Sequence, residues 1–297
     1  MKDISILIPT YNDRCTTLVE ALQQQASTLD ISYEIIVADD GSTDADVLSA
    51  NRAINQLPHC RMVECPENKG RAAIRNFLAQ QAQYPWLLFL DCGIAIHQQH
   101  FLHNYALSDG SDVIDGGISI LDDGSQSRAN LRYLYELKAA PRHSARQRSL
   151  RPYHHFRTTN FMISRNIMLR LPFDERFRSY GYEDVIFGKA LEHHQVSIQH
   201  IDNPVVLQHF ESNDRFLSKT EEGLRTLHQF QDELQGYSRL LDLARRLAPV
   251  APLVRYMHRH IRLWERRILL RRPTLLLFNL YRIGYFLSIR PKREQNL

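Results

Sequence analysis

The stretch YEIIVADDGSTDAD, residues 33–46, decides the fold that the sequence predicts. Its run Ile35–Ala38 is apolar and rich in β-branched residues, which is typical of a buried strand. Asp39 and Asp40 end this run, and Gly41 lets the chain turn sharply toward a helix that a following serine or threonine can cap. Because open α/β sheets bind ligands at the carboxyl ends of their strands, the two acids are candidate ligand-binding residues, although a structural role in the turn and cap would also explain them.

Segments with strand and helix patterns alternate on either side of that stretch. The predicted elements are a strand at Ile4–Pro9, a helix at Thr16–Ala26, the strand above, a helix at Asp46–Leu57, a strand at Cys60–Glu64, a helix at Gly70–Gln83 and a strand at Trp86–Leu90. This alternation predicts a mainly parallel, doubly wound sheet. Neither the GxGxxG fingerprint nor a GxxxxGK[ST] phosphate loop is present, so an ordinary NAD domain or P-loop ATPase is not expected.

The pattern becomes less regular after Asp91. We expect a strand with a Gly-Gly kink at Asp112–Ile120, a helix at Asn130–Ala139, a long basic loop at Pro141–Arg157, a strand at Thr159–Ser164, a helix at Val185–His194 and short strands at Ser197–Ile201 and Val205–Phe210. A loop as long as the basic one is usually functional or mobile. From Asp214 onward the chain is predicted to be helical, so we expect a domain at residues 1–213 and a helical extension at residues 214–297.

Composition favours a globular protein made in a reducing compartment. The chain has 297 residues, 43% of them hydrophobic, which suits a substantial apolar core. None of its four cysteines are spaced as CxxC, so free thiols are expected rather than a zinc or thioredoxin-like site. The beginning MKDISILIPT lacks the apolar core of a signal peptide and predicts a cytoplasmic protein.

The C-terminal part carries most of the positive charge. The chain has a net charge of +4, but residues 239–297 alone hold 14 Lys and Arg against three Asp and Glu. Apolar and basic residues are mixed over Leu240–Arg272, and the more apolar Thr274–Ile289 is shorter than the ~20 residues that a spanning helix needs and contains Arg282. We favour a membrane-surface contact, while packing on the catalytic domain or a second subunit remains the alternative. No motif supports a nucleic-acid partner.

Seven segments, taken in order, resemble family 2 glycosyltransferases with the GT-A fold. They are SILIPTYND, EIIVADDGSTD, ENKGRAAIRN, WLLFLDCG, TTNFMISR, FDERFRSYGYEDVIFG and NPVVLQHFE, and they cover roughly residues 3–215. The resemblance implies a GT-A (Rossmann-like) α/β fold, with a mixed, mainly parallel sheet flanked by helices and here followed by the C-terminal helical extension. It implies an inverting enzyme that moves one sugar from a nucleotide-diphosphate-sugar, of the UDP type, to a glycan acceptor in cell-surface polysaccharide synthesis. The basic extension favours a lipid-linked acceptor and a place on the inner face of the cytoplasmic membrane.

The same resemblance assigns the donor-binding residues. They are Pro9, Thr10, Tyr11, Asp39, Asp40, Lys69, Arg75 and Asp91. Asp40 would contact the base or ribose, because an ionised carboxylate accepts hydrogen bonds from N–H and hydroxyl groups. Arg71 is left either as a cation near the diphosphate or as part of a solvated helix face.

The expected metal motif is incomplete. In the family an Asp-Xaa-Asp motif holds Mn²⁺ or Mg²⁺ against the diphosphate, but here Asp91 is followed by Cys92 and Gly93, so the second acid is missing. Asp91 and His209 could share the metal, which is the interpretation we favour. Otherwise catalysis is independent of a metal, or the chain binds its donor weakly and is catalytically impaired.

Glu183-Asp184 resembles the acidic pair of inverting members. Asp184 would take the proton from the acceptor hydroxyl, and Glu183 would orient the acceptor or support the loop. No QxxRW-like sequence follows, so a processive polymerase is not expected. Two other functions stay open: an impaired module that binds a nucleotide-sugar or a glycan, and a scaffold that recruits enzymes to the membrane.

Overall fold

The computed structural model describes residues 2–108, 110–122, 124 and 127–289, and the chain divides into two compact units. Unit 1 consists of residues 1–121, 139–178 and 183–209, and unit 2 consists of residues 122–138, 179–182 and 210–297. Unit 1 has an apolar cluster on each face of its main sheet, and unit 2 has a separate cluster among its helices. The last eight residues of the predicted basic extension, 290–297, lie outside the described residues.

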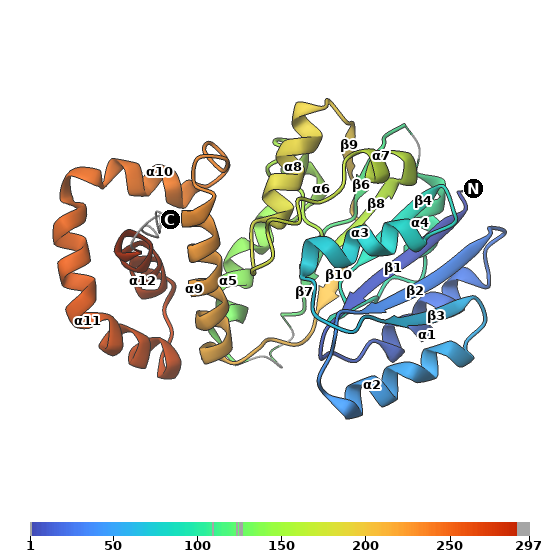
Figure 1. Cartoon of the computed structure of the whole chain (residues 1–297), viewed down its shortest axis with the longest axis horizontal. Coiled ribbons are helices and arrows are strands. Elements are labelled where there is room, and N and C mark those ends of the chain that lie inside the picture. Colours follow the sequence, from blue (N-terminus) through green and yellow to red (C-terminus); the bar gives the residue numbers. More distant parts are fainter. Residues whose placement is uncertain (1, 109, 123, 125–126, 290–297) are drawn as a thin grey trace, which may run out of the picture. The chain divides into compact units, whose positions relative to one another are not determined.

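Unit 1 is built on a mainly parallel sheet (Figure 1). Its strand order is β3-β2-β1-β4-β8-β6-β9, with β8 antiparallel to both of its neighbours. These strands are β1 (Ile4–Thr10), β2 (Tyr33–Asp39), β3 (Cys60–Glu64), β4 (Trp86–Leu90), β6 (Val113–Asp115), β8 (Asn160–Ser164) and β9 (Ile198–His200). A second sheet has the order β5-β10-β7, formed by β5 (Ile94–Ala95), β10 (Val205–Leu207) and β7 (Ile118–Ile120). The predicted α/β class with a mainly parallel sheet is confirmed.

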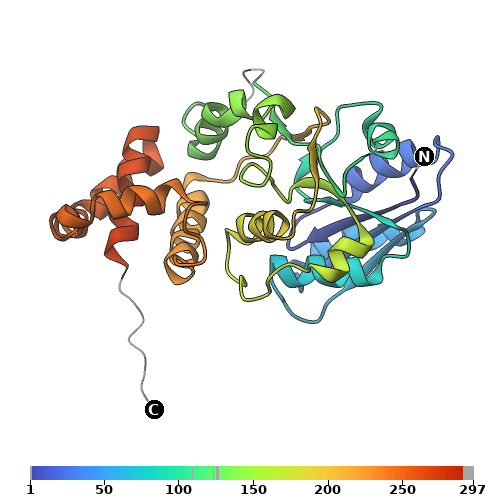
Figure 2. The same cartoon turned by 90° about the horizontal axis from the view of Figure 1, so that it is seen from above.

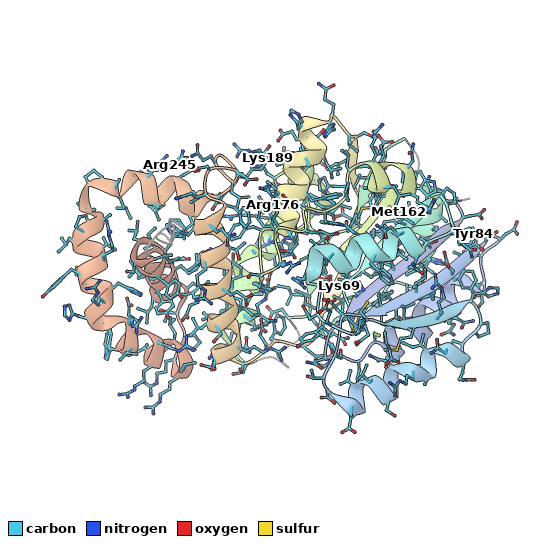
Figure 3. The ribbon with its side chains drawn as sticks, viewed as in Figure 1. Lys69, Tyr84, Met162, Arg176, Lys189 and Arg245 are labelled. Carbon is cyan, nitrogen blue, oxygen red and sulfur yellow. The ribbon has the colours of Figure 1, made fainter. Side chains whose placement is uncertain are left out.

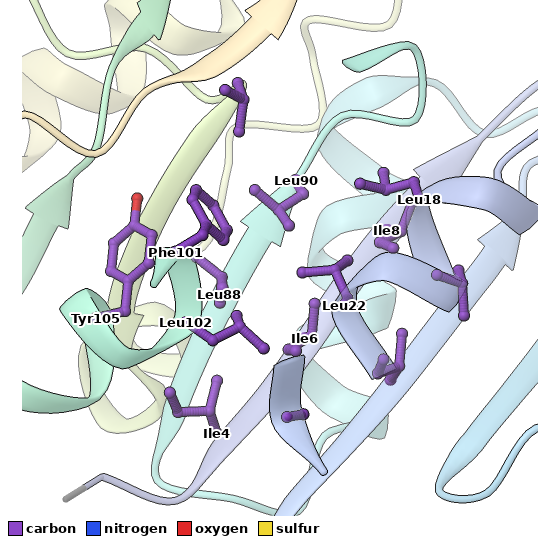
Figure 4. Packing of buried hydrophobic residues seen from close by; sticks show 14 of the residues in the cluster. Ile4, Ile6, Ile8, Leu18, Leu22, Leu88, Leu90, Phe101, Leu102 and Tyr105 are labelled. Carbon is purple, nitrogen blue, oxygen red and sulfur yellow. The ribbon is translucent and has the colours of Figure 1, made fainter. Parts of the chain in front are cut away.

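Helices cover both faces of the main sheet, and Figure 2 shows α1 and α3 on opposite sides of it. The helices of unit 1 are α1 (Thr16–Ala26), α2 (Ala45–Arg52), α3 (Arg71–Gln81), α4 (Phe101–Leu107), α6 (Ala145–Ser149), α7 (Arg165–Arg170) and α8 (Glu183–His193), with 3₁₀ turns at Ala53–Gln56 and Ala140–Arg142. Successive strand residues point to opposite faces, so Ile6 packs with α1 and α4 (Figure 4). Leu7, on the other face, packs with α3. This two-sided cover holds the carboxyl ends of β1, β2 and β4 at one edge.

Two predicted segments differ from the structure. Asp112–Ile120 was expected as one kinked strand, but it forms β6 and β7 in different sheets. The break falls at two positions that need glycine: a Cβ at Gly116 would lie 2.2 Å from the Tyr105 hydroxyl, and one at Gly117 would lie 2.6 Å from the Arg148 guanidinium. The basic segment expected as a loop contains α6, where buried Arg148 pairs with Asp115 at 2.9 Å. This segment is therefore anchored in the core.

Unit 2 is helical. It contains α5 (Leu131–Ala139), α9 (Asn213–Gln229), α10 (Arg239–Arg246), α11 (Ala251–Arg271) and α12 (Leu275–Ser288), with a 3₁₀ turn at Ala248–Val250. Phe216, Leu269 and Phe278 belong to its apolar cluster. Within the described part of the chain, no helix has both the length and the apolar character that crossing a bilayer requires.

The long helix α11 has an unusual distribution of side chains. It buries His258 and Glu265 but exposes large apolar residues. The exposed ones include Tyr256 at 65%, Leu263 at 73% and Trp264 at 61%. A helix that only packed on its own unit would bury such residues instead.

Candidate functional site

The two acids at the end of β2 both have protein partners. Asp39 is buried, and its carboxylate accepts hydrogen bonds from the backbone N–H and the hydroxyl of Ser42. Asp40 is also buried, and its two oxygens accept the backbone N–H groups of Lys69 at 2.8 Å and Gly70 at 3.0 Å. Burial raises the pKa of the Asp40 carboxyl, and these two N–H groups oppose that rise. A carboxylate has about four acceptor positions, so the two acids retain capacity for a ligand.

Gly41 brings the turn after β2 against the segment that precedes α3. Its φ is +74°, and a Cβ there would lie 2.5 Å from the backbone of Glu67. Only glycine fits both this conformation and this close approach. Together with the Asp40 hydrogen bonds, the contact fixes where α3 begins.

The loop after β1 is joined to the loop after β2. The side-chain oxygen of Asn12 accepts the backbone N–H groups of Thr43 and Asp44, and the backbone N–H of Asn12 donates to the Ser42 hydroxyl at 2.7 Å. Pro9 is half-buried, Thr10 is buried, and Tyr11 is 47% exposed. Tyr11 is thus the residue of the three whose ring is open to a ligand.

The first turns of α3 bring cations to Asp91. Arg75 is buried and donates to Asp91 Oδ1 at 2.6 Å, while the Thr159 hydroxyl donates to Asp91 Oδ2 at 3.1 Å. Arg71, one helical turn before Arg75, lies 3.7 Å from Asp91 Oδ2 and 3.4 Å from Glu183 Oε1. Arg71 is about half-exposed, so it is the cation of this pair that a ligand could reach.

Lys69 stands just before α3 (Figure 3). Its ammonium lies 5.6 Å from the centre of the Phe77 ring. Its backbone N–H is the one that Asp40 accepts, so it contributes to the loop through its main chain as well.

The acidic pair begins α8. Glu183 is buried beside Arg71, and Asp184 is half-buried. Burial, followed by the nearby charge of Glu183, raises the pKa of Asp184 to about 6, against the opposing charges of Arg157 and Arg71. A carboxylate with such a pKa is ionised near neutral pH and is a stronger base than an ordinary aspartate.

The backbone immediately before this pair is constrained. Gly181 and Tyr182 have φ values of +95° and +70°. The left-handed region is rarely occupied by a residue with a side chain such as that of Tyr182. Backbone conformations of this kind gather at functional sites.

The surroundings of Asp91 supply carboxylate oxygens but no assembled metal site among the described residues. No group of three or more His, Cys, Asp or Glu side chains suited to a metal ion occurs among the residues that the structure describes. Another acid lies beside the position of the missing one, because a Cβ built on Gly93 would lie 3.1 Å from Oδ2 of Asp13. Mg²⁺ and Mn²⁺ prefer oxygen ligands, and a cation that also binds a diphosphate needs only one or two protein carboxylates.

His209, the other predicted ligand, is exposed in the segment after β10. β10 pairs antiparallel with β5, and Leu207 lies opposite Ile94. Since Ile94 follows Asp91 by three residues, this pairing directs the segment after β10 toward the residues after Asp91. The shared metal site therefore stays a prediction with which the strand pairing is compatible.

Sequence reasoning underrated three residues. Arg71 bridges Asp91 and Glu183, Arg157 lies close enough to lower the pKa of Asp184, and Thr159 donates to Asp91. Arg71 could have been found from its spacing of four residues before Arg75, which places both on one helix face. Nothing local to Arg157 or Thr159 indicates their partners.

Comparisons with known proteins agree on one family. Residues 5–171 match the family model described as glycosyl transferase family 2. An uncharacterized glycosyltransferase of Haemophilus influenzae is 34% identical over 91 residues, which is 30% of this chain and 35% of that protein. The chondroitin synthase of Pasteurella multocida is 27% identical over 221 residues, which is 63% of this chain and 23% of that protein. The matched regions span between 13% and 35% of the length of the curated relatives.

Solved structures show the fold. The mannosyltransferase PcManGT of Pyrobaculum calidifontis, in complex with GDP-Man and Mn²⁺, has a TM-score of 0.55 at 15% identity, covering 97% of this chain and 87% of that one. Residues 1–349 of S. aureus TarS, in complex with UDP, have a TM-score of 0.50 at 17% identity, covering 96% of this chain and 90% of that one. This likeness, with the sheet order above, confirms the predicted GT-A fold.

Proposed function

The chain belongs to glycosyl transferase family 2, and from this premise we propose that it is an inverting glycosyltransferase that moves a single sugar from a UDP-type nucleotide-sugar to a glycan acceptor. One observation carries the proposal: Arg71 lies 3.7 Å from Asp91 and 3.4 Å from Glu183. A half-exposed cation thus connects the residue assigned to the donor diphosphate with the pair assigned to the acceptor. Such an arrangement suits a reaction in which negative charge grows on the leaving diphosphate while a base takes a proton.

Asp184 is the proposed base. The acceptor oxygen forms a bond to C1 of the sugar as its proton passes to the Asp184 carboxylate, and the bond from C1 to the diphosphate oxygen breaks with its electrons on the diphosphate. Attack opposite the leaving group inverts the configuration at C1. Glu183 holds Arg71 and supports the beginning of α8, so its role is to position.

The donor would lie along the carboxyl ends of β1, β2 and β4. Tyr11 offers an exposed ring for the base, and the remaining acceptor capacity of Asp40 and Asp39 suits base or ribose donors, with Pro9 and Thr10 shaping the loop. Arg71 and Lys69 supply positive charge near the diphosphate, and buried Arg75 orients Asp91. Mn²⁺ or Mg²⁺, held by Asp91 and His209, would neutralise the leaving diphosphate.

The acceptor is proposed to be a lipid-linked glycan of a cell-surface polysaccharide. Relatives include proteins named for chondroitin and for teichoic acid, both of which are polymers. The exposed apolar residues of α11 alternate with arginines, which suits the surface of an anionic membrane. We therefore assign the GT-A glycosyltransferase domain to residues 1–213, the membrane contact to the extension at residues 214–297, and the enzyme to the inner face of the cytoplasmic membrane.

A second candidate is a nucleotide-sugar-binding module without transfer activity. It is favoured by the engagement of both Asp91 oxygens by Arg75 and Thr159, together with glycine at position 93. Binding alone cannot separate the two candidates, because both would bind the donor.

The test is a panel of nucleotide-sugars followed by thermal unfolding, with and without Mn²⁺, and then by product analysis. A bound donor stabilises the folded state, so the cognate nucleotide-sugar should raise the Tm. Sugar transfer with release of the nucleoside diphosphate supports the enzyme, and stabilisation without any product supports the binding module. If no nucleotide-sugar and no nucleoside diphosphate changes the Tm, both candidates are wrong.

A further inference from the structure

Asp13 lies beside the position at which the Asp-Xaa-Asp pattern lacks its second acid. A Cβ at Gly93 would lie 3.1 Å from Asp13 Oδ2, and this is the one atom found within 4 Å of that Cβ, its chain neighbours aside. Asp13 follows β1 and Gly93 follows β4, two strands that pair in parallel, so both residues stand at the same edge of the sheet. A side chain at position 93 would therefore reach the space that the Asp13 carboxylate borders.

The main chain of Asp13 is held in place while its carboxylate remains available. Its carbonyl oxygen accepts the Thr10 hydroxyl at 2.8 Å and the side-chain amide of Asn51, which is fully buried, at 2.9 Å. The residue is exposed, and among the described residues its carboxylate accepts no hydrogen bond and forms no ion pair. The main chain of Asp13 is thus fixed by two hydrogen bonds, and its carboxylate is open to a cation.

The other acids at this edge are already engaged. Asp91 is paired with Arg75 and receives the Thr159 hydroxyl, and Asp40 and Asp39 accept two hydrogen bonds each. The Arg75 cation at 2.6 Å from Asp91 weakens the attraction of this carboxylate for a metal ion, so a second acid is needed beside Asp91. Asp13 is therefore the acid at this edge with the most capacity left for a metal ion.

We propose that Asp13 supplies the second carboxylate of the divalent-cation site, the one that Gly93 lacks. The cation would be bound together with a nucleoside diphosphate, by Asp13 from the β1–α1 loop and by Asp91 from the end of β4, beside the His209 ligand proposed above. This inference rests on the proposed function and deepens it. It assigns the second carboxylate, which the Asp-Xaa-Asp pattern after β4 lacks, to the loop after β1.

The experiment titrates the full chain with Mn²⁺, first in the presence of UDP and then of GDP. Electron paramagnetic resonance measures the concentration of free Mn²⁺ at each step, which gives the affinity. Asp13→Asn keeps the shape and removes the charge, and Asp46→Asn, an exposed acid of α2, is the matched control. Loss of a group that only hydrogen-bonds a metal ligand already costs about 10–100-fold in metal affinity, so Asp13→Asn should weaken Mn²⁺ binding roughly tenfold or more while Asp46→Asn should not. The double variant Asp13→Ala, Gly93→Asp should regain most of the affinity, because the acid returns from the neighbouring position.

Three results would contradict the inference in distinguishable ways. Wild-type affinity in Asp13→Asn overturns the role of Asp13 and leaves the proposed function intact. A folded double variant that binds Mn²⁺ as weakly as Asp13→Asn would show that an acid at position 93 does not take the place of Asp13. If the wild type does not bind Mn²⁺ in the presence of UDP or of GDP, this inference fails together with the metal ion of the proposed function. Nucleotide binding measured by calorimetry in EDTA then still tests the donor site.

Discussion

Asp40 shows how a residue predicted to bind a ligand also holds the protein together. Its two oxygens accept the backbone N–H groups at the entrance to α3, and Gly41 beside it allows the two loops to touch. A backbone donor that loses its partner in a buried place costs free energy. The position of α3, and with it of Arg71 and Arg75, depends on this carboxylate.

We expect Asp40→Ala to lower the free energy of unfolding by about 1–3 kcal/mol without any nucleotide present, because the buried N–H of Gly70 and the part-buried N–H of Lys69 lose their acceptor. Chemical denaturation of the variant and of the wild type measures this. Asp30→Ala, which removes an exposed acid outside these loops, should leave the unfolding curve unchanged. A stability of Asp40→Ala equal to that of the wild type would show that the hydrogen bonds to Lys69 and Gly70 contribute little.

Arg71 should influence the pH dependence of the reaction. Its charge lowers the pKa of Asp184, which burial and Glu183 raise to about 6. Removing the cation in Arg71→Ala should therefore raise that pKa, and the acidic limb of kcat/KM should move to higher pH, since only the ionised carboxylate accepts a proton. Arg71→Lys keeps the charge and should leave the limb close to that of the wild type. If the acidic limb of the kcat/KM profile stays at the same pH in Arg71→Ala, Arg71 does not influence the pKa of the base.

The packing of α11 on α12 depends on a glycine. A Cβ at Gly284 would lie 2.7 Å from the ring and 3.1 Å from the Cβ of His258, which is buried. Gly223 is also helical, in α9, but a Cβ there would make only ordinary contact, 3.6 Å from the Tyr180 carbonyl oxygen.

We expect Gly284→Ala to destabilise unit 2 by about 1–3 kcal/mol, because the extra methyl group overpacks the contact between the helices. Gly223→Ala should be neutral or stabilising by up to about 1 kcal/mol, because alanine favours the helix. Thermal unfolding of the two variants provides the comparison. Equal Tm values for both would mean that α11 and α12 do not pack as closely as the structure shows.

Local sequence pattern predicted most of the first hundred residues. Cys60–Glu64, Trp86–Leu90 and Thr16–Ala26 have the predicted bounds, because each is a short element whose burial follows its own periodicity. The Gly-Gly kink was predicted, but the separation of β6 and β7 into two sheets was not, because it depends on pairing with β8 and β10 later in the chain. The short helices α4 and α7 gave too little periodic signal to be recognised.

The candidate site likewise has residues that the sequence predicts and contacts that it does not. Acids at the ends of β2 and β4 follow from strand position, so they were found from sequence. The contact between Arg71 and Glu183 joins residues 112 positions apart, and no local pattern records it. The partners of Asp39 and Asp40 were likewise hidden, and the structural roles that the sequence left open for these acids exist beside their proposed ligand role.

The chain as a whole combines a GT-A fold with a basic helical part whose long helix exposes aromatic and aliphatic side chains. Each cation near an anionic bilayer contributes about 1 kcal/mol, and salt weakens this attraction. Full-length protein should therefore co-sediment with vesicles that contain anionic lipid at low salt, and less at high salt or with neutral lipid.

Substitution of the exposed face tests that expectation. Leu263→Glu combined with Trp264→Glu should reduce vesicle binding, because both residues would enter the interface. Leu150→Glu changes an equally exposed leucine in unit 1 and should have no effect. If wild-type protein stays in solution with anionic vesicles at low salt, the membrane surface and the lipid-linked acceptor lose their support.

Activity of the Asp184→Asn variant tests the proposed base most directly. Nucleotide binding by calorimetry and sugar transfer to an acceptor glycan are measured on the same preparations of wild type and variant, across pH 5 to 8. We predict that both bind the nucleoside diphosphate equally, that wild-type kcat/KM rises with pH through an apparent pKa near the value of about 6 for Asp184, and that the variant loses transfer by roughly 10²–10⁴-fold. An Asp184→Asn variant that turns over like the wild type would contradict the assignment of the base and, with it, the proposed mechanism.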